Sequence, residues 1–256
     1  MQCLQQCSAV PTVLYLEERM ITKEAVMNNL NTGRQQAGGN VRPQAGSRIS
    51  TMSMVQVAIF GAVICIMAFT PFLGYIPLGF TRATIIHVPV IIGAIILGPK
   101  YGAYLGLVFG VTSLVKATIT PGVTSFVFSP FVTIGGYSGN MWSAVIAIVP
   151  RVCIGIVAYF VYKLIMKAAH GIKGSQTVAL WVAGIAGAMT NTLLVMNGIY
   201  IFFGQSYAAA SNKAVEHIYD VILGIILGFG IPEAIVAGIL TTAITKVLFK
   251  IMKDNG

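Results

Sequence analysis

The polar residues that could do chemistry stand out because their surroundings are almost entirely apolar. Arg151 lies about ten residues into an apolar run, and Glu233 follows a Gly230-Ile231-Pro232 break in another run. A charge at mid-membrane costs about 2.5–3.5 kcal/mol or more, so Arg151 should face the protein interior and have a partner. Two interpretations follow: the two residues form an ion pair that joins two helices, or one or both line a solute site.

Further polar side chains lie near these two in predicted membrane depth. Asparagine amides offer both donors and acceptors to a small polar ligand, although interhelical hydrogen bonds are an equally good use for them. Arg82 could equally be a solvated interfacial charge, and His87 a packed, hydrogen-bonded histidine. The candidate substrate-binding residues are Arg82, His87, Asn140, Arg151, Asn191, Asn197 and Glu233.

The composition indicates the class of protein whose structure must position these residues. Of 256 residues, 56% are hydrophobic and 9% are charged, whereas a soluble domain has about 25% charged residues. A soluble fold could not make a polar surface from so few charges. This excludes a soluble enzyme, a nucleic-acid-binding domain and a disordered protein, and it predicts an all-α membrane protein with several spans.

The chain divides into a tail and a membrane body. Residues 1–51 are polar and rich in helix breakers, and we expect a disordered cytoplasmic tail there. Met52 and Met54 directly precede the first apolar run, which suggests the hypothesis that translation starts at one of them. Residues 52–256 are predicted to form a single substrate-binding domain of six transmembrane helices. The expected spans are Met54–Thr70, Thr84–Gly98, Tyr101–Lys116, Met141–Tyr162, Thr177–Phe203 and Ile218–Thr245, with a weaker possibility of a short or re-entrant segment at Val123–Ile134.

The basic residues indicate the orientation. With both termini in the cytoplasm, the inner side receives seven lysines of the body, and the outer side receives Arg82, Lys213 and at most Lys116. This distribution fits the positive-inside rule. The seven inner residues are Lys100, Lys163, Lys167, Lys173, Lys246, Lys250 and Lys253.

Several enzyme motifs are missing from the chain. It has no G-x-x-x-x-G-K-[ST] segment to hold ATP phosphates, no H-E-x-x-H, no G-x-S-x-G and no aspartate-rich motif. The four cysteines lack metal-ligand spacing and are expected to be free thiols. We therefore expect no enzyme activity, no metal and no cofactor in this chain.

Small residues recur at intervals of four in two predicted helices. Ala58 and Ala62 form such a pair in the first span, and Gly102, Gly106 and Gly110 form a series in the third. Small residues let helix backbones approach closely in lipid. The spacing fits packing within the chain and docking to another membrane subunit equally well.

These features together resemble a known family. Six spans, the Ala58-x-x-x-Ala62 pair and the run from Thr84 to Lys100 are similar to the S component of energy-coupling factor (ECF) vitamin transporters. The pantothenate-specific type is most similar. The segments that carry this second likeness are Ser125-Phe-Val-Phe-Ser-Pro130, Pro150-Arg151, Asn191–Gly198 and Gly230-Ile-Pro-Glu233.

The resemblance implies a six-helix bundle in the plasma membrane of a prokaryote. It implies that the chain binds a vitamin from outside, beneath the loop from Pro71 to Thr81. It also implies partners, namely a transmembrane T subunit and two ATP-binding-cassette (ABC) ATPases that use the ATP. The residues expected to dock on the T subunit are Ala58, Ala62, Gly102 and Gly106.

Pantothenate is an anion with an amide and hydroxyls. The likeness therefore assigns Arg151 to the carboxylate and Asn191 and Asn197 to the amide and hydroxyls. The alternative is a stand-alone secondary transporter driven by an ion gradient. Such carriers usually keep acidic residues in mid-membrane, and here Glu233 alone qualifies.

Overall fold

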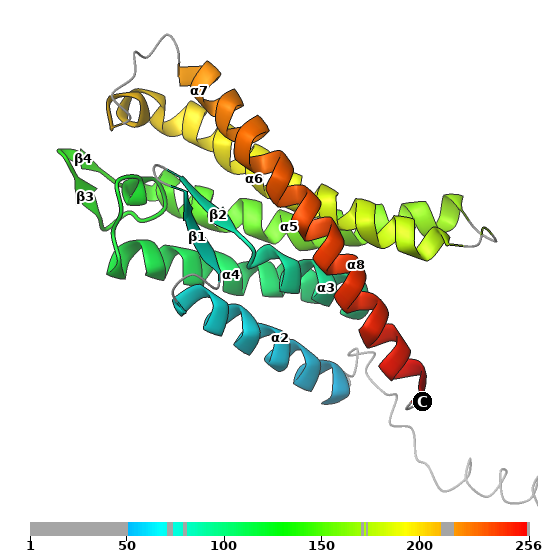
Figure 1. The fold of residues 1–256 in the computed structure, drawn as a ribbon. Helices are drawn as coiled ribbons and strands as arrows, with labels where there is room; N and C mark the ends of the chain where they lie inside the picture. Colours follow the sequence, from blue (N-terminus) through cyan, green and yellow to red (C-terminus); the bar gives the residue numbers. More distant parts are fainter. Residues whose placement is uncertain are drawn as a thin grey trace, which may run out of the picture. The chain divides into compact units, whose positions relative to one another are not determined.

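The computed structural model describes residues 51–70, 74–78, 81–169, 172, 174–210 and 218–254. Within them, five helical stretches are long and apolar enough to cross a membrane, and a sixth apolar helix is shorter. This confirms the all-α, six-helix prediction (Figure 1). Residues 1–50 lie outside the described part, so the disordered cytoplasmic tail remains a prediction. The helices are α2 (Thr51–Phe69), α3 (His87–Leu97), α4 (Pro99–Ile119), α5 (Met141–Ala168), α6 (Ser175–Ala210), α7 (Ile218–Ile225) and α8 (Ile231–Asp254).

The second and third predicted spans are separated by a sharp corner. Gly98 has φ +104°, a backbone conformation that favours glycine, and Pro99 opens α4 where its missing N–H costs nothing. Helix α3 has only 11 residues. It begins at His87 and not at Thr84, because residues Thr81–Thr84 form a strand. Nine of its residues are buried, which places α3 inside the bundle.

Glycines bring α4 and α5 into close contact. A side chain added at Gly102 or Gly155 would meet the other helix, and one added at Gly106 would meet the carbonyl of Arg151. Gly110 faces the carbonyl of Ala147 in the same way. The structure thus uses Gly102 and Gly106, which we expected to dock on a partner, for packing inside the chain. This packing holds α4 directly against the stretch of α5 that carries Arg151.

The sequence predicts a break in the sixth span at Gly230-Ile231-Pro232, but the structure shows a span that is irregular there and continuous. Helices α7 and α8 are joined by a π-helical turn, η3 (Ile226–Gly230). Pro232 cannot donate to the carbonyl four residues before it, and the wider turn accommodates this loss. Gly230 lies against the side chain of Thr192 in α6. The bulge therefore sets how the next turn, which carries Glu233, meets the bundle.

Two short hairpins lie outside the long helices. Strand β1 (Tyr75–Leu78) pairs antiparallel with β2 (Thr81–Thr84), and β3 (Thr133–Ile134) pairs with β4 (Tyr137–Ser138). The 3₁₀ turn η1 (Ser125–Val127) precedes β3. The stretch Val123–Ile134, for which we considered a re-entrant segment, consists of this turn and the start of the second hairpin.

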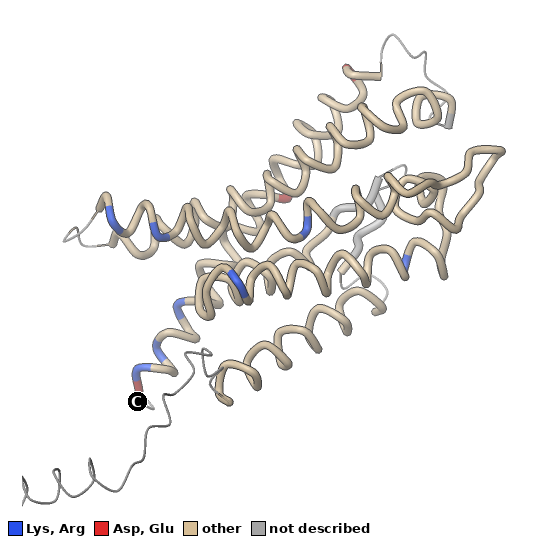
Figure 2. Tube along the Cα trace, turned by 180° about the vertical axis from the view of Figure 1, so that it is seen from behind, with Lys and Arg blue, Asp and Glu red and all other residues tan. Residues whose placement is uncertain are grey.

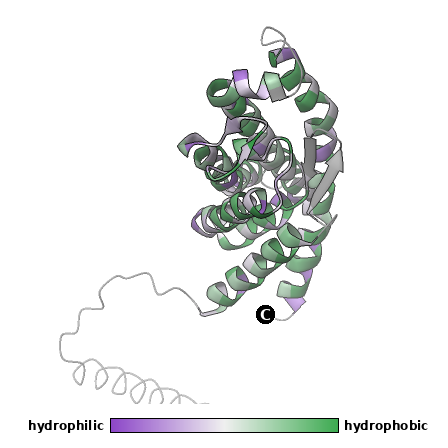
Figure 3. Cartoon of the chain, turned by 90° about the vertical axis from the view of Figure 1, so that its left-hand side faces the viewer, coloured by the Kyte–Doolittle hydropathy of each residue, from purple (hydrophilic) through white to green (hydrophobic). Residues whose placement is uncertain are grey.

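The surface of the helices matches a lipid environment. Large apolar side chains such as Ile201, Leu164 and Leu227 are more than half exposed, at 69%, 67% and 60%, and Figure 3 shows hydrophobic residues along the helices. Basic residues gather where α4 begins and where α5 and α8 end (Figure 2). Burying the long apolar surfaces in a bilayer removes them from water, so the body spans a membrane.

Candidate functional site

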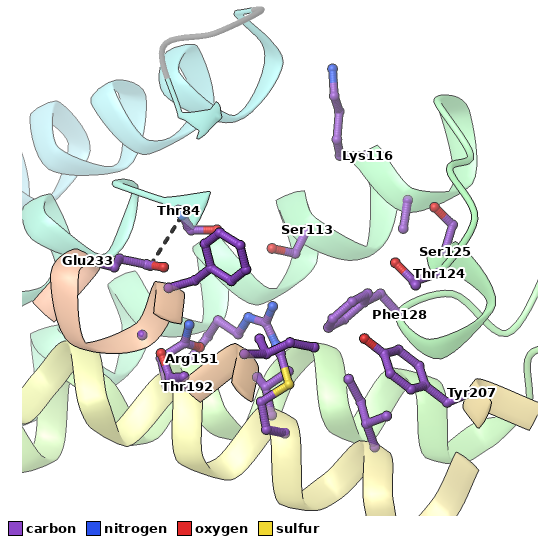
Figure 4. Close-up of a pocket in the computed structure, with 18 residues that line it drawn as sticks. Thr84, Ser113, Lys116, Thr124, Ser125, Phe128, Arg151, Thr192, Tyr207 and Glu233 are labelled. Carbon is purple, nitrogen blue, oxygen red and sulfur yellow. Dashed lines mark hydrogen bonds between the residues drawn. The ribbon is translucent and has the colours of Figure 1, made fainter. Parts of the chain in front are cut away.

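A cavity opens among α4, α5, α6, the π turn and the end of β2. Its empty space amounts to about 980 Å³ when open solvent is included. Its wall mixes apolar and polar groups (Figure 4). The lining residues are Thr84, Ser113, Lys116, Ala117, Thr124, Ser125, Phe128, Arg151, Asn191, Thr192, Val195, Met196, Ile199, Tyr207, Ile225, Phe229, Gly230 and Glu233.

Arg151 is the buried cation of this cavity, with 7% of its side chain exposed. Its Nη1 donates to the backbone carbonyl of Ile146 over 2.6 Å. This carbonyl is available because the residue four positions on is Pro150, which has no N–H to donate. The guanidinium also lies over Phe128 and Phe109, at 5.1 and 5.7 Å from the ring centres. The helix defect and the two rings together fix the direction of the cation.

Glu233 supplies a carboxylate to the same cavity. Its Oε1 accepts a hydrogen bond from the backbone N–H of Thr84 over 3.2 Å and lies 3.5 Å from Nδ1 of His87. These contacts join α8 to the end of β2 and the first residue of α3. The close contacts of Glu233 therefore go to Thr84 and His87, and the same cavity also holds Arg151.

A second, almost wholly apolar cavity lies beside the first. Thr84, Phe229 and Glu233 line both of them, and His87 lines only the second. His87 is 1% exposed, and its Nε2 finds no hydrogen-bond partner among the described residues. His87 is thus a buried neighbour of the carboxylate and is not among the residues that line the first cavity.

Asn191 and Asn197 differ in the structure although they lie on the same helix. Asn191 is 8% exposed, lines the cavity, and its Oδ1 has no hydrogen-bond partner among the described residues. Asn197 is exposed and donates to the backbone carbonyl of Leu193 over 2.8 Å. Six residues on an α-helix span 600°, so the two side chains cannot share a face. Asn191 therefore offers an unused acceptor to a ligand.

Two further predicted site residues, Asn140 and Arg82, are not among the described residues that line the cavity. Asn140 is the N-cap of α5: its Oδ1 accepts from the Trp142 N–H, and its own N–H donates to Ser143. This role is structural, and Asn140 is absent from the cavity lining that the structure describes. Arg82 belongs to β2, but its side chain lies outside what the structure describes. The structure thus brings Arg151, Asn191 and Glu233 together in one cavity.

Several lining residues were not singled out from the sequence. Ser113, Thr124, Ser125, Thr192 and Tyr207 are hydroxyl-bearing residues of ordinary membrane helices and loops. Hydroxyls are common in such segments and carry no distinctive spacing. The available signal was the resemblance, because Ser125 and Phe128 lie in its Ser125–Pro130 segment and Thr192 lies in its Asn191–Gly198 segment.

The two expected docking residues of α2 lie on the surface. Ala58 and Ala62 are exposed, and an added side chain at the intervening Gly61 would meet nothing within 4 Å. The buried residues of this helix are instead Ile64 and Ala68. The small-residue pair therefore takes no part in internal packing.

The family model for the substrate-specific component of ECF transporters matches residues 52–245. The chain belongs to this family. An S component is a substrate-binding membrane subunit and not itself an enzyme. The match begins where the predicted membrane body begins.

Two curated relatives show how far the likeness extends. The chain is 40% identical over 202 residues to the pantothenic acid transporter PanT of Lactococcus lactis subsp. cremoris, covering 78% of this chain and 94% of the relative. It is 29% identical over 216 residues to the pantothenate transporter PanT of Leuconostoc mesenteroides, covering 82% and 98%. Among solved structures, the S component for biotin from an ECF-type ABC transporter is 19% identical with a TM-score of 0.41, covering 76% of this chain and 91% of that one.

Proposed function

We propose that this S component binds pantothenate in the cavity around Arg151 and delivers it to the cytoplasm as part of an ECF importer. The observation that carries the proposal is one buried arginine held in a cavity with an unused amide acceptor. Pantothenate presents a carboxylate for the first and an amide N–H or hydroxyl for the second. The two PanT relatives support this choice of vitamin.

The binding chemistry follows from how the cavity is held. The carboxylate would accept charge-assisted hydrogen bonds from the guanidinium, which are stronger than neutral ones. Because the guanidinium is already oriented by Ile146 and Phe128, little ordering is needed on binding. Asn191 Oδ1 would accept from the amide N–H, so the ligand satisfies an atom that is otherwise buried without a partner.

Transport would require partners. The exposed Ala58 and Ala62 would meet a transmembrane T subunit, and two ABC ATPases attached to it would hydrolyse ATP. The distribution of basic residues supports a cytoplasmic location of both termini in a prokaryotic plasma membrane. Membership of the ECF family argues against a stand-alone secondary transporter.

Equilibrium binding of purified protein tests the proposal. A panel of labelled vitamins, with pantothenate and biotin among them, should give high affinity for pantothenate alone. Arg151→Met should weaken pantothenate binding by about a hundredfold or more, because a buried charge partner is lost. Arg151→Lys, which keeps the charge without the planar fork, should lose less. The proposal would be contradicted by wild-type protein that does not bind pantothenate, or by a folded Arg151→Met variant whose affinity is unchanged.

A further inference from the structure

The cavity holds a carboxylate as well as a guanidinium, which recognition of an anion does not explain. Glu233 lines the cavity together with Arg151. Both of its contacts, to Thr84 N–H and His87 Nδ1, go to Oε1. The described residues give Oε2 no hydrogen-bond partner. The protein thus anchors one oxygen of this carboxylate and leaves the other for a ligand.

The two charged groups occupy different parts of the cavity. In Figure 4, Glu233 and Phe128 lie on opposite sides, and the Arg151 side chain extends between them toward Phe128. Arg151 is anchored by Ile146 and the aromatic rings, while Glu233 is anchored by Thr84 and His87. Each side chain thus has contacts of its own that hold it, besides any attraction between the two charges. The cavity therefore has a cationic part and an anionic part that are both held before a ligand arrives.

We infer that Glu233 determines specificity by accepting a hydrogen bond from a hydroxyl at the ligand end remote from the carboxylate. The ligand class is then a monoanion with a carboxylate at one end and a hydroxyl donor at the other. This inference deepens the proposed function and rests on it. In pantothenate, the carboxylate would lie at Arg151 and the hydroxyl-bearing end at Glu233, with the amide between them near Asn191.

The same carboxylate would reject certain ligands. A phosphate on the terminal hydroxyl would place a second anionic group beside Glu233, and like charges at a buried contact repel each other strongly. A hydrogen in place of the terminal hydroxyl would leave Oε2 without its donor. Glu233 would therefore select the free vitamin over its phosphorylated form.

Competition binding with labelled pantothenate tests this. The competitors are pantothenate, the analogue lacking the terminal hydroxyl, its terminal methyl ether, and the form phosphorylated at that hydroxyl. Wild-type protein should bind the deoxy analogue and the ether about tenfold more weakly than pantothenate. It should bind the phosphorylated form weaker still, by about a hundredfold or more.

Glu233→Gln is the matched variant, because its amide oxygen can still accept from Thr84. The affinity ratio of pantothenate to the phosphorylated form should fall at least about tenfold in this variant. Glu233→Asp, which keeps the charge, should keep the rejection. A role limited to holding β2 and α8 together would lower all affinities in parallel and leave these ratios unchanged.

The outcomes separate the two proposals. Wild-type protein that does not bind pantothenate overturns both. Pantothenate binding with an unchanged ratio in Glu233→Gln overturns the role of Glu233 and leaves the proposed function standing. If Glu233→Gln does not fold, the wild-type series decides: equal affinity for the methyl ether and the phosphorylated form would contradict rejection of charge at this end.

Discussion

Arg151 donates from Nη1 to the backbone oxygen of Ile146, five residues before it on the same helix, over 2.6 Å. The bond exists because Pro150 lies at the position whose N–H would otherwise take that oxygen. The helix hydrogen bond that Pro150 cannot make thus leaves an acceptor that holds the Arg151 side chain in place. Pro150 and Arg151, which are adjacent in the sequence, therefore act together to orient a cation inside the membrane.

Pro150→Ala should separate helix stability from ligand binding. The new N–H would compete with Arg151 for the Ile146 carbonyl, so α5 gains about 1 kcal/mol from a hydrogen bond. The same change loosens the guanidinium. We expect a thermal midpoint in detergent that is unchanged or higher, and pantothenate binding that is weaker by about tenfold. Weaker binding with a lower midpoint would indicate general misfolding instead.

The two asparagines of α6 allow the same substitution to be compared inside and outside the cavity. Asn191→Ala should weaken pantothenate binding by about tenfold, because its buried Oδ1 would lose the ligand donor. Asn197→Ala should leave the dissociation constant unchanged, because this side chain is exposed and bonded to Leu193. Isothermal titration calorimetry of both variants measures this, and equal effects would contradict the assignment of Asn191 to the site.

Two glycines should respond to alanine with opposite signs. Gly106 lies against the Arg151 carbonyl, so an added methyl group pushes α4 away from α5 and should lower both the thermal midpoint and ligand affinity. Gly204 of α6 has nothing within 4 Å of an added methyl group. Gly204→Ala should stabilise by about 0.5–1 kcal/mol through reduced backbone freedom. Thermal unfolding in detergent compares them; a tolerated Gly106→Ala would show that the helix contact can relax.

Ala58→Trp and Ala62→Trp should separate binding from transport. Both positions are exposed, so pantothenate binding by the isolated protein should remain. Uptake into proteoliposomes containing the complete transporter should be lost if this face meets the T subunit. Ile239→Trp, at a position of α8 that is 55% exposed, is the control and should leave both unchanged. Loss of ligand binding in the α2 variants would mean that the pair supports the fold of the body.

Much of the fold and part of the site could be predicted from the sequence, because these features depend on residues that are close together in the chain. The spans and the irregular turn before Glu233 follow from apolar length and from the backbone limits of glycine and proline. Arg151 and Glu233 stood out because ionised groups are costly in an apolar run, whatever they pair with.

The tertiary structure decided which polar residues share a cavity. The choice between Asn191 and Asn197 depended on the direction of a helix face, and the role of Asn140 as a cap depended on Ser143 and Trp142. The partner of Glu233 depended on an approach of β2, 149 residues away. Likewise, Gly102 and Gly106 pack on α5, while Ala58 and Ala62 lie on the surface. A spacing of four residues states only that small residues share a face, and the packing of whole helices determines what that face meets.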